Sequence, residues 1–291
     1  MTETNIQNRE SAQESALASL EWPVERVIKP AKRRLKVRHL WRERPIIQVL
    51  ASRDFKVKYK QSVLGPLWLV FQPIALLLAF LVAFRGLADV QTSGVPYSVF
   101  ALTGLTAWAF VQAALTIGAA SLVSNINYIR FTPCPRPAFP IAAMIASLPA
   151  FVVTGLGAIV AAAIAGRLSP KIVLLPLGLL WLLLLMFGVV SILAALAVRY
   201  RDIISALPFL LQVGLFLAPV GYSLPELSST VRTIVELNPL TGVIEGLRWM
   251  MLSNYEVPIE PIAISLFLTA LLLVGGWRLF TRLETTMADD I

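Results

Sequence analysis

The stretch IVLLPLGLLWLLLLMFGVVSILAALAV, from Ile172 to Val198, decides the fold class. It contains no acidic or basic residue and no strand-like alternation of polar and apolar residues. A helix of about 20 residues is enough to cross the roughly 30 Å hydrocarbon core of a bilayer. Because hydrocarbon cannot solvate backbone amides, an apolar segment of this length must satisfy its own hydrogen bonds as a helix. The stretch therefore predicts a transmembrane helix.

Further apolar stretches without a charge in the middle have the same character: Leu67–Phe84, Ser98–Val123, Ala138–Ala165, Ile203–Tyr222 and Ile262–Trp277. The composition agrees, with 57% hydrophobic residues, 14% charged residues and a mean hydropathy of +0.75. We therefore expect an all-α integral membrane protein with six transmembrane helices.

The positive charge is concentrated at the N-terminus. The net charge is +8, and of the 25 Lys and Arg residues 14 precede Gln61. Cytoplasmic flanks of membrane helices are enriched in these residues, so the N-terminal arm is predicted to be cytoplasmic, and six spans then place both termini there. Anionic lipid headgroups account for such an arm, and no nucleic-acid partner is predicted.

The segment 45–66 carries two conflicting patterns. Ile46, Ile47 and Leu50 suggest a helical apolar face, whereas Phe55–Lys60 alternates with the period of a strand. An isolated strand at a membrane would leave its edges unpaired, so we expect an amphipathic helix in the interface, with its lysines extending toward water. The expected division of the chain is a polar basic cytoplasmic arm (1–44), this interfacial helix (45–66), a six-span domain (67–282) and a cytoplasmic tail (283–291).

Two connections between the spans are long: an inner one over residues 124–137 and an outer one over 223–261. The outer segment is amphipathic, and its pattern predicts two short helices hinged at Asn238-Pro239. A re-entrant hairpin lining a cavity on the outer side is the arrangement we expect. Basic residues stand among its acidic residues, so the charged positions are interpreted as solvated helix faces: Glu226, Arg232, Glu236, Glu245, Arg248 and Glu256.

Several kinds of chemistry are missing from the sequence. No GxxxxGK[ST] phosphate loop occurs, the single histidine (His39) lies in the basic arm, and the single cysteine (Cys134) offers no metal-ligand set. We predict no catalytic residue, no metal site and no cofactor bound by this chain. Proton-coupled transport normally needs ionisable groups inside the bilayer, but the most polar groups there are Gln112 and Gln212. A membrane-embedded glycan or lipid transferase is disfavoured, because it would need carboxylates or histidines gathered near one interface. The acidic residues of the outer segment instead have arginines among them.

A series of short motifs resembles one family in its order along the chain. The motifs are Arg53–Ser62, Leu64–Trp68, Gln72-Pro73, Pro96-Tyr97 with Phe100, Gly104-Leu105 with Trp108, Ser121–Asn125, Pro135-Arg136 with Pro140, Tyr200–Asp202, Ala218–Val220, Asn238–Leu240 and Glu245–Trp249. Together they are similar to permease subunits of ABC-type polysaccharide exporters, which export O-antigen, capsule and teichoic acid precursors. The resemblance covers about Arg53 to Arg282.

This resemblance implies partners that spacing alone does not show. Such permeases are homodimers in the bacterial inner membrane and carry two copies of a cytoplasmic ABC ATPase subunit, which binds ATP and Mg. The expected cargo is a lipid-linked glycan of the O-antigen type, surrounded by membrane lipids. Exporters of a teichoic acid, a drug or a lipid are alternatives within the same class.

The resemblance also assigns candidate residues. Coupling to the ATPase falls on Arg53, Asp54, Asn125, Tyr128, Arg130 and Arg136, with an inner coupling helix over about 124–137. The outer gate falls on Asn238, Pro239, Arg248 and Trp249. Aromatic rings offer a sugar an apolar face, and the candidates for the substrate path are Trp68, Phe71, Tyr97, Phe100 and Trp108.

Each of these assignments has a simpler alternative. Anchoring at the membrane interface is the alternative for each aromatic residue. Ordinary positive charge on the inner side is the alternative for Arg136. Pro133, Pro135 and Pro137 depart from the family's pattern, so a coupling helix that continues to Arg136 is not expected.

Overall fold

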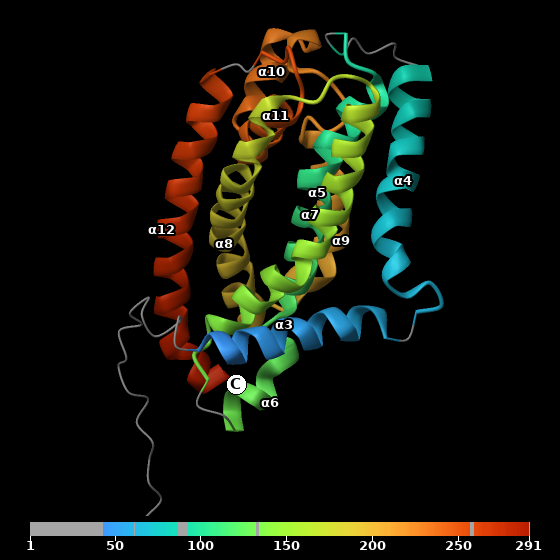
Figure 1. Ribbon diagram of the computed structural model, residues 1–291. Coiled ribbons are helices and arrows are strands. Elements are labelled where there is room, and N and C mark those ends of the chain that lie inside the picture. Colours follow the sequence, from blue (N-terminus) through green and yellow to red (C-terminus); the bar gives the residue numbers. More distant parts are fainter. Residues whose placement is uncertain are drawn as a thin grey trace, which may run out of the picture. The chain divides into compact units, whose positions relative to one another are not determined.

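The structure is a computed structural model that describes residues 43–60, 62–86, 92, 94–131, 134–256 and 259–290. Most of the predicted N-terminal arm lies outside these residues. Within the described part every regular element is a helix, and the only β pairing there is an isolated bridge between Leu168 and Leu252. The prediction of an all-α membrane protein is confirmed (Figure 1).

The helices within the longest apolar segments are α4 (Trp68–Phe80), α5 (Tyr97–Ala120), α7 (Ala138–Ile164), α8 (Leu175–Arg199) and α12 (Ile259–Asp290). The 3-10 turn η1 (Gly65–Leu67) precedes α4, the π-helical turn η2 (Leu81–Gly86) extends it, and the 3-10 turn η4 (Pro170–Leu174) precedes α8. Among the described residues, five segments are long and apolar enough to cross a membrane: Gly65–Phe84, Tyr97–Ala120, Ala138–Ile164, Pro170–Arg199 and Ile259–Glu284.

The remaining predicted span, Ile203–Tyr222, is shorter than expected. It corresponds to α9 (Asp202–Leu217), which has 16 residues. At 1.5 Å per residue α9 is about 24 Å long, less than the roughly 30 Å of a hydrocarbon core. The helix ends because Ala218 precedes Pro219 and adopts an extended conformation, which a following proline favours. The count of six spans is therefore not confirmed.

The conflicting pattern before the first span is resolved as a helix. Helix α3 (Arg44–Tyr59) includes the alternating residues 55–59, so the helical interpretation is correct, although the helix ends before residue 66. It lies across one end of the bundle, which we call the α3 end (Figure 1). Its buried face packs against α7 and belongs to an apolar cluster that also includes residues of α8, α12 and the end of α5. The cluster contains Ile47, Leu50, Ala51, Leu122, Ala138, Phe139, Ala194 and Phe280.

The inner connection contains two short helical pieces, η3 (Val123–Asn125) and α6 (Ile126–Phe131). Helix α6 ends at Phe131, and residues 134–137 before α7 are not helical. As the prolines predicted, no helix continues to Arg136.

The outer segment forms the 3-10 turn η5 (Leu224–Glu226) and two short helices, α10 (Ser229–Glu236) and α11 (Pro239–Met251). The break falls at Asn238, as predicted. Its side-chain oxygen accepts a hydrogen bond from the Leu240 amide (3.0 Å), and Pro239 occupies the first turn, where its missing amide hydrogen costs no hydrogen bond. A gating or re-entrant role for these helices stays a prediction.

Helices α8 and α12 pack very closely through glycines. A Cβ atom added to Gly276 would lie 2.4 Å from the Gly188 carbonyl oxygen, and one added to Gly188 would lie 2.6 Å from the Leu272 carbonyl oxygen. Small residues allow this approach of two backbones, which is how helices associate where lipid provides no hydrophobic drive. By contrast, a Cβ atom added to Gly275 would meet nothing within 4 Å.

Candidate functional site

A buried ion pair lies near the end of the bundle opposite α3. The Arg248 side chain is 0% exposed, and its Nη1 donates to Glu245 Oε1 at 2.7 Å. The Tyr255 hydroxyl donates to the other oxygen of Glu245 at 2.6 Å. Burial raises the pKa of Tyr255, so the hydroxyl remains a proton donor. The guanidinium carbon of Arg248 lies 3.6 Å from the centre of the Phe100 ring, a cation–π contact.

The same arginine holds the turn that follows α9. Its Nη2 donates to the Val220 carbonyl at 2.8 Å, and the Tyr97 hydroxyl donates to the neighbouring Gly221 carbonyl at 2.8 Å. Gly104 on α5 leaves room for this contact, since an added Cβ atom would lie 2.8 Å from the Val220 oxygen and 3.0 Å from Arg248 Nη2. We call this set the Arg248 cluster: Tyr97, Phe100, Gly104, Val220, Gly221, Glu245, Arg248 and Tyr255. It joins α5, α11 and the chain after α9.

The Arg248 cluster corrects the interpretation of the outer charges as solvated helix faces. Glu226 and Glu256 are exposed, as expected, but Glu245 and Arg248 are buried. The signal that could have found them is their i, i+3 spacing, which places opposite charges together on one face of a helix that is otherwise apolar.

The other gate candidates lie apart from this pair. Asn238 Nδ2 donates to the Leu217 carbonyl at 3.2 Å and so ties the break between α10 and α11 to the end of α9. Pro239 accepts a hydrogen bond from the Ser265 hydroxyl of α12. Trp249 is half-buried, and the Lys171 ammonium lies 4.5 Å from the centre of its ring.

Four of the six coupling candidates meet at the α3 end. Arg53 Nη2 donates to Asp54 Oδ1 at 2.7 Å and to Asn125 Oδ1 at 2.6 Å. The Arg53 guanidinium lies 5.2 Å from the centre of the Tyr128 ring. Asn125 Nδ2 in turn donates to the Ser121 carbonyl at 2.7 Å, at the end of α5. We call Arg53, Asp54, Asn125 and Tyr128 the Arg53 cluster, and it links α3 to η3 and α6.

The two remaining coupling candidates do not join the Arg53 cluster in what the structure describes. Arg136 donates a hydrogen bond to the Glu284 carbonyl of α12. The side chain of Arg130 lies outside the described residues. Arg136 therefore links the inner connection to α12 and not to α3.

The five aromatic candidates do not share one surface. Trp68 and Phe71 are 43% and 49% exposed on α4, and Trp68 Nε1 donates to the Ser62 hydroxyl at 2.9 Å. Tyr97 and Phe100 are buried in the Arg248 cluster. Trp108 is also buried, and a Cβ atom added to Gly214 of α9 would lie 3.2 Å from its ring. A sugar path along all five stays a prediction.

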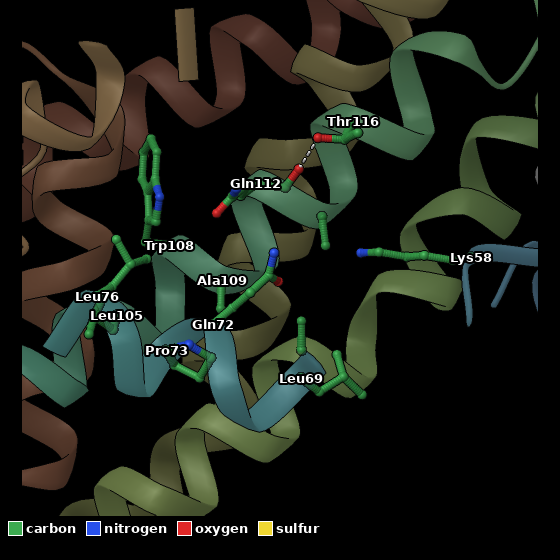
Figure 2. A pocket seen from close by; sticks show the side chains of 12 residues that line it. Lys58, Leu69, Gln72, Pro73, Leu76, Leu105, Trp108, Ala109, Gln112 and Thr116 are labelled. Atoms are coloured by element: carbon green, nitrogen blue, oxygen red, sulfur yellow. Dashed lines mark hydrogen bonds between the residues drawn. The ribbon is translucent and has the colours of Figure 1, made fainter. Parts of the chain in front are cut away.

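Trp108 lines a cavity of about 170 Å³ beside α3, α4 and α5. Lys58 of α3 reaches into it from one side, and the amides of Gln72 (α4) and Gln112 (α5) lie on the others (Figure 2). The remaining wall is mostly apolar: Leu69, Pro73, Leu76, Leu105, Trp108, Ala109, Ala113, Thr116 and Ala150. Sequence reasoning missed this site, because Lys58 was interpreted only as a lysine extending to water.

Comparison with known proteins identifies the family. Residues 46–252 match the family described as ABC-2 type transporter. The chain belongs to the ABC-2 type transporter family. Two relatives from Klebsiella pneumoniae, each named O-antigen export system permease protein RfbA, are 26% and 24% identical over 247 and 250 residues, which is 84% of this chain and 94% of each relative. A relative of the same name from Myxococcus xanthus is 23% identical over 258 residues, 88% of this chain and 98% of the relative.

The matched region of this ABC-2 type transporter runs from α3 to the end of α11. It contains both the Arg53 cluster and nearly all of the Arg248 cluster, since only Tyr255 follows residue 252. Among the described residues no group of three or more His, Cys, Asp or Glu side chains could hold a metal ion. The candidate sites are thus the Arg53 cluster at the α3 end, the Arg248 cluster at the opposite end, and the cavity lined by Trp108.

Proposed function

We propose that this chain is the membrane-spanning subunit of an ATP-driven exporter that moves a lipid-linked, O-antigen-like polysaccharide across the bacterial inner membrane. Two copies form the channel, and two copies of a cytoplasmic ABC ATPase bind ATP and Mg and drive it. The observation that carries the proposal is the near full-length similarity to three O-antigen export permeases, within a family of transporters.

The proposal places the α3 end on the cytoplasmic side, in agreement with the positive charge that precedes Gln61. The ATPase then docks on α6 and on the surface around the Arg53 cluster. Tyr128 supports this placement, because it is a large aromatic side chain that is 55% exposed on α6. Exposed aromatic side chains beside charges are typical of protein interfaces.

Motion of the ATPase reaches the membrane in two steps. A displacement of α6 and the preceding η3 acts on α3 through the hydrogen bond between Arg53 and Asn125. Helix α3 is followed within a few residues by η1 and α4, the span segment with the smallest buried share, 17% of its apolar window. Because α4 packs loosely within its own protomer, it can move relative to α5 with little loss of packing. The path opens beside α4, between the two copies.

The Arg248 cluster has the opposite role in this mechanism. A buried ion pair with both carboxylate oxygens occupied is costly to separate. The ends of α5, α9 and α11 therefore move as one unit on the outer side. Helix α4 moves relative to that unit.

The test is purification of the tagged chain from its native membranes, followed by identification of the proteins that come with it. The proposal expects an ABC ATPase in a one-to-one ratio with the chain, and ATP hydrolysis that falls when Arg53 is replaced by Ala. A chain that purifies without any ATPase, from membranes in which the candidate ATPase is present, would overturn the proposal.

A further inference from the structure

The cavity beside α3, α4 and α5 contains three polar side chains, Lys58, Gln72 and Gln112, that form no hydrogen bond or ion pair within the described part of the chain. The Lys58 ammonium lies 5.5 Å from the centre of the Tyr59 ring, a cation–π contact. No carboxylate among the described residues lies within ion-pair distance of Lys58. The side-chain amides of Gln72 and Gln112 likewise form no hydrogen bond within the described part of the chain. Lys58 and Gln72 are exposed and Gln112 is half-buried, so all three are accessible to a ligand that enters the cavity. The three side chains therefore favour a ligand that supplies negative charge and hydrogen-bond acceptors.

The polarity of the cavity changes with depth. Helix α5 ends at Ala120, so at 1.5 Å per residue Thr116, Gln112 and Trp108 lie about 6, 12 and 18 Å from its end. Lys58 enters from α3, at the surface end, while Trp108 lies near the middle of a hydrocarbon core of roughly 30 Å. The wall thus runs from a cation, through amides, to an apolar floor formed by Leu76, Leu105 and Trp108 (Figure 2).

We propose that this cavity binds the phosphate-bearing end of a lipid from the leaflet at the α3 end. Lys58 contacts the phosphate oxygens, the amides of Gln72 and Gln112 donate hydrogen bonds, and the first part of the hydrocarbon chain lies against Leu76, Leu105 and Trp108. The ligand chemistry is a phosphate or diphosphate ester of a long hydrocarbon chain, as in an anionic phospholipid or a polyprenyl phosphate carrier.

Two further observations agree with this occupant. The volume of about 170 Å³ takes a phosphate group and a short length of chain but not a whole lipid, so the rest of the chain lies outside, where α4 exposes Ile74, Leu78 and Val82. Lys58 is exposed as a residue, but desolvation beside the apolar wall lowers its pKa, and a bound phosphate would offset that effect by stabilising the ammonium. The proposal concerns binding alone and does not depend on which polymer is transported.

The test uses the full-length protein in phosphatidylcholine nanodiscs that contain a small fraction of either phosphatidylglycerol or a polyprenyl phosphate, with the retained lipid counted by native mass spectrometry. The variant Lys58→Gln is expected to lower retention about tenfold, the effect of losing one charge-assisted hydrogen bond, whereas Lys58→Arg retains the lipid. Gln112→Leu is expected to lower retention independently. Lys60→Gln is the matched control, because Lys60 is also exposed at the end of α3 but does not line the cavity.

The two lipid arms separate the possible sources. Lys58-dependent retention of the polyprenyl phosphate alone identifies a carrier site, and retention of phosphatidylglycerol alone identifies a site for a resident phospholipid; either result supports the proposal. Retention that is equal in all variants, or that falls equally in Lys58→Gln and Lys60→Gln, would overturn it, because the attraction would then be that of a general basic surface.

Discussion

Replacing Glu245 by Gln is the sharpest test of the Arg248 cluster. The change keeps the shape of the side chain but leaves the Arg248 cation fully buried without its counter-charge. Removing one partner of a buried pair costs about 3–5 kcal/mol. The Val220 carbonyl and the Phe100 ring still contact the guanidinium in the variant. We therefore expect the free energy of unfolding to fall by the lower limit of that range, about 3 kcal/mol.

The assay is an unfolding titration of the purified protein with sodium dodecyl sulfate in mixed micelles, followed by tryptophan fluorescence. Glu256→Gln is the matched control, because it makes the same chemical change at an exposed position just beyond α11. Surface substitutions of this kind change stability by less than about 0.5 kcal/mol. A 3 kcal/mol loss lowers the folding equilibrium constant more than about a hundredfold, which separates the two variants clearly.

The double variant Glu245→Leu with Arg248→Met makes the test quantitative. If the two side chains act as a pair, it loses less stability than the sum of the two single changes, and the difference is their coupling energy. Equal stability of Glu245→Gln and Glu256→Gln would refute the assignment of a buried, mutually dependent pair.

Three further predictions test other parts of the molecule. Gly276→Ala pushes a methyl group against the backbone of α8 and should cost about 1–3 kcal/mol in the same titration, whereas Gly275→Ala, with open space around it, should be nearly neutral; equal losses would argue against the close α8–α12 contact. Arg53→Ala should lower ATP hydrolysis by the complex with little change in the amount of protein in the membrane, and unchanged hydrolysis would exclude the link between α3 and α6 as the coupling route. Arg136→Glu should lower the stimulated ATP hydrolysis of the complex in liposomes by a larger factor than it lowers the amount of protein; unchanged transport would count against this residue as a coupling site.

The helical fold could be predicted because one constraint dominates it. Apolar segments such as Ile172–Val198 have no alternative to a helix in hydrocarbon, and hydropathy alone locates them. The same constraint explains α3, where the alternation of residues 55–60 favoured a strand but no partner strand was available. Hydropathy overestimated the length of the helix in Ile203–Tyr222, because composition does not register that Pro219 favours an extended conformation at the preceding residue, where α9 ends.

The sites were less predictable because they depend on contacts between distant segments. Family resemblance named Arg53, Asp54, Asn125 and Tyr128 as coupling candidates but not their contacts, because the hydrogen bond from Arg53 to Asn125 joins residues 72 positions apart and leaves no local pattern. The burial of Arg248 was missed because an arginine is usually solvated, and its carbonyl and ring partners come from the turn after α9 and from α5. The cavity at Lys58 was missed for the same reason, since its wall is assembled from four helices.

The most direct test of the proposed function is mass spectrometry of lipid extracts from cells that lack this chain, compared with the parent strain and with the deletion strain carrying the gene on a plasmid. The account predicts that a glycan linked to polyprenyl diphosphate accumulates inside the deletion cells, disappears from the surface, and returns to normal in the complemented strain. An unchanged surface glycan with no accumulated lipid-linked intermediate would contradict the account and favour export of a drug or a lipid.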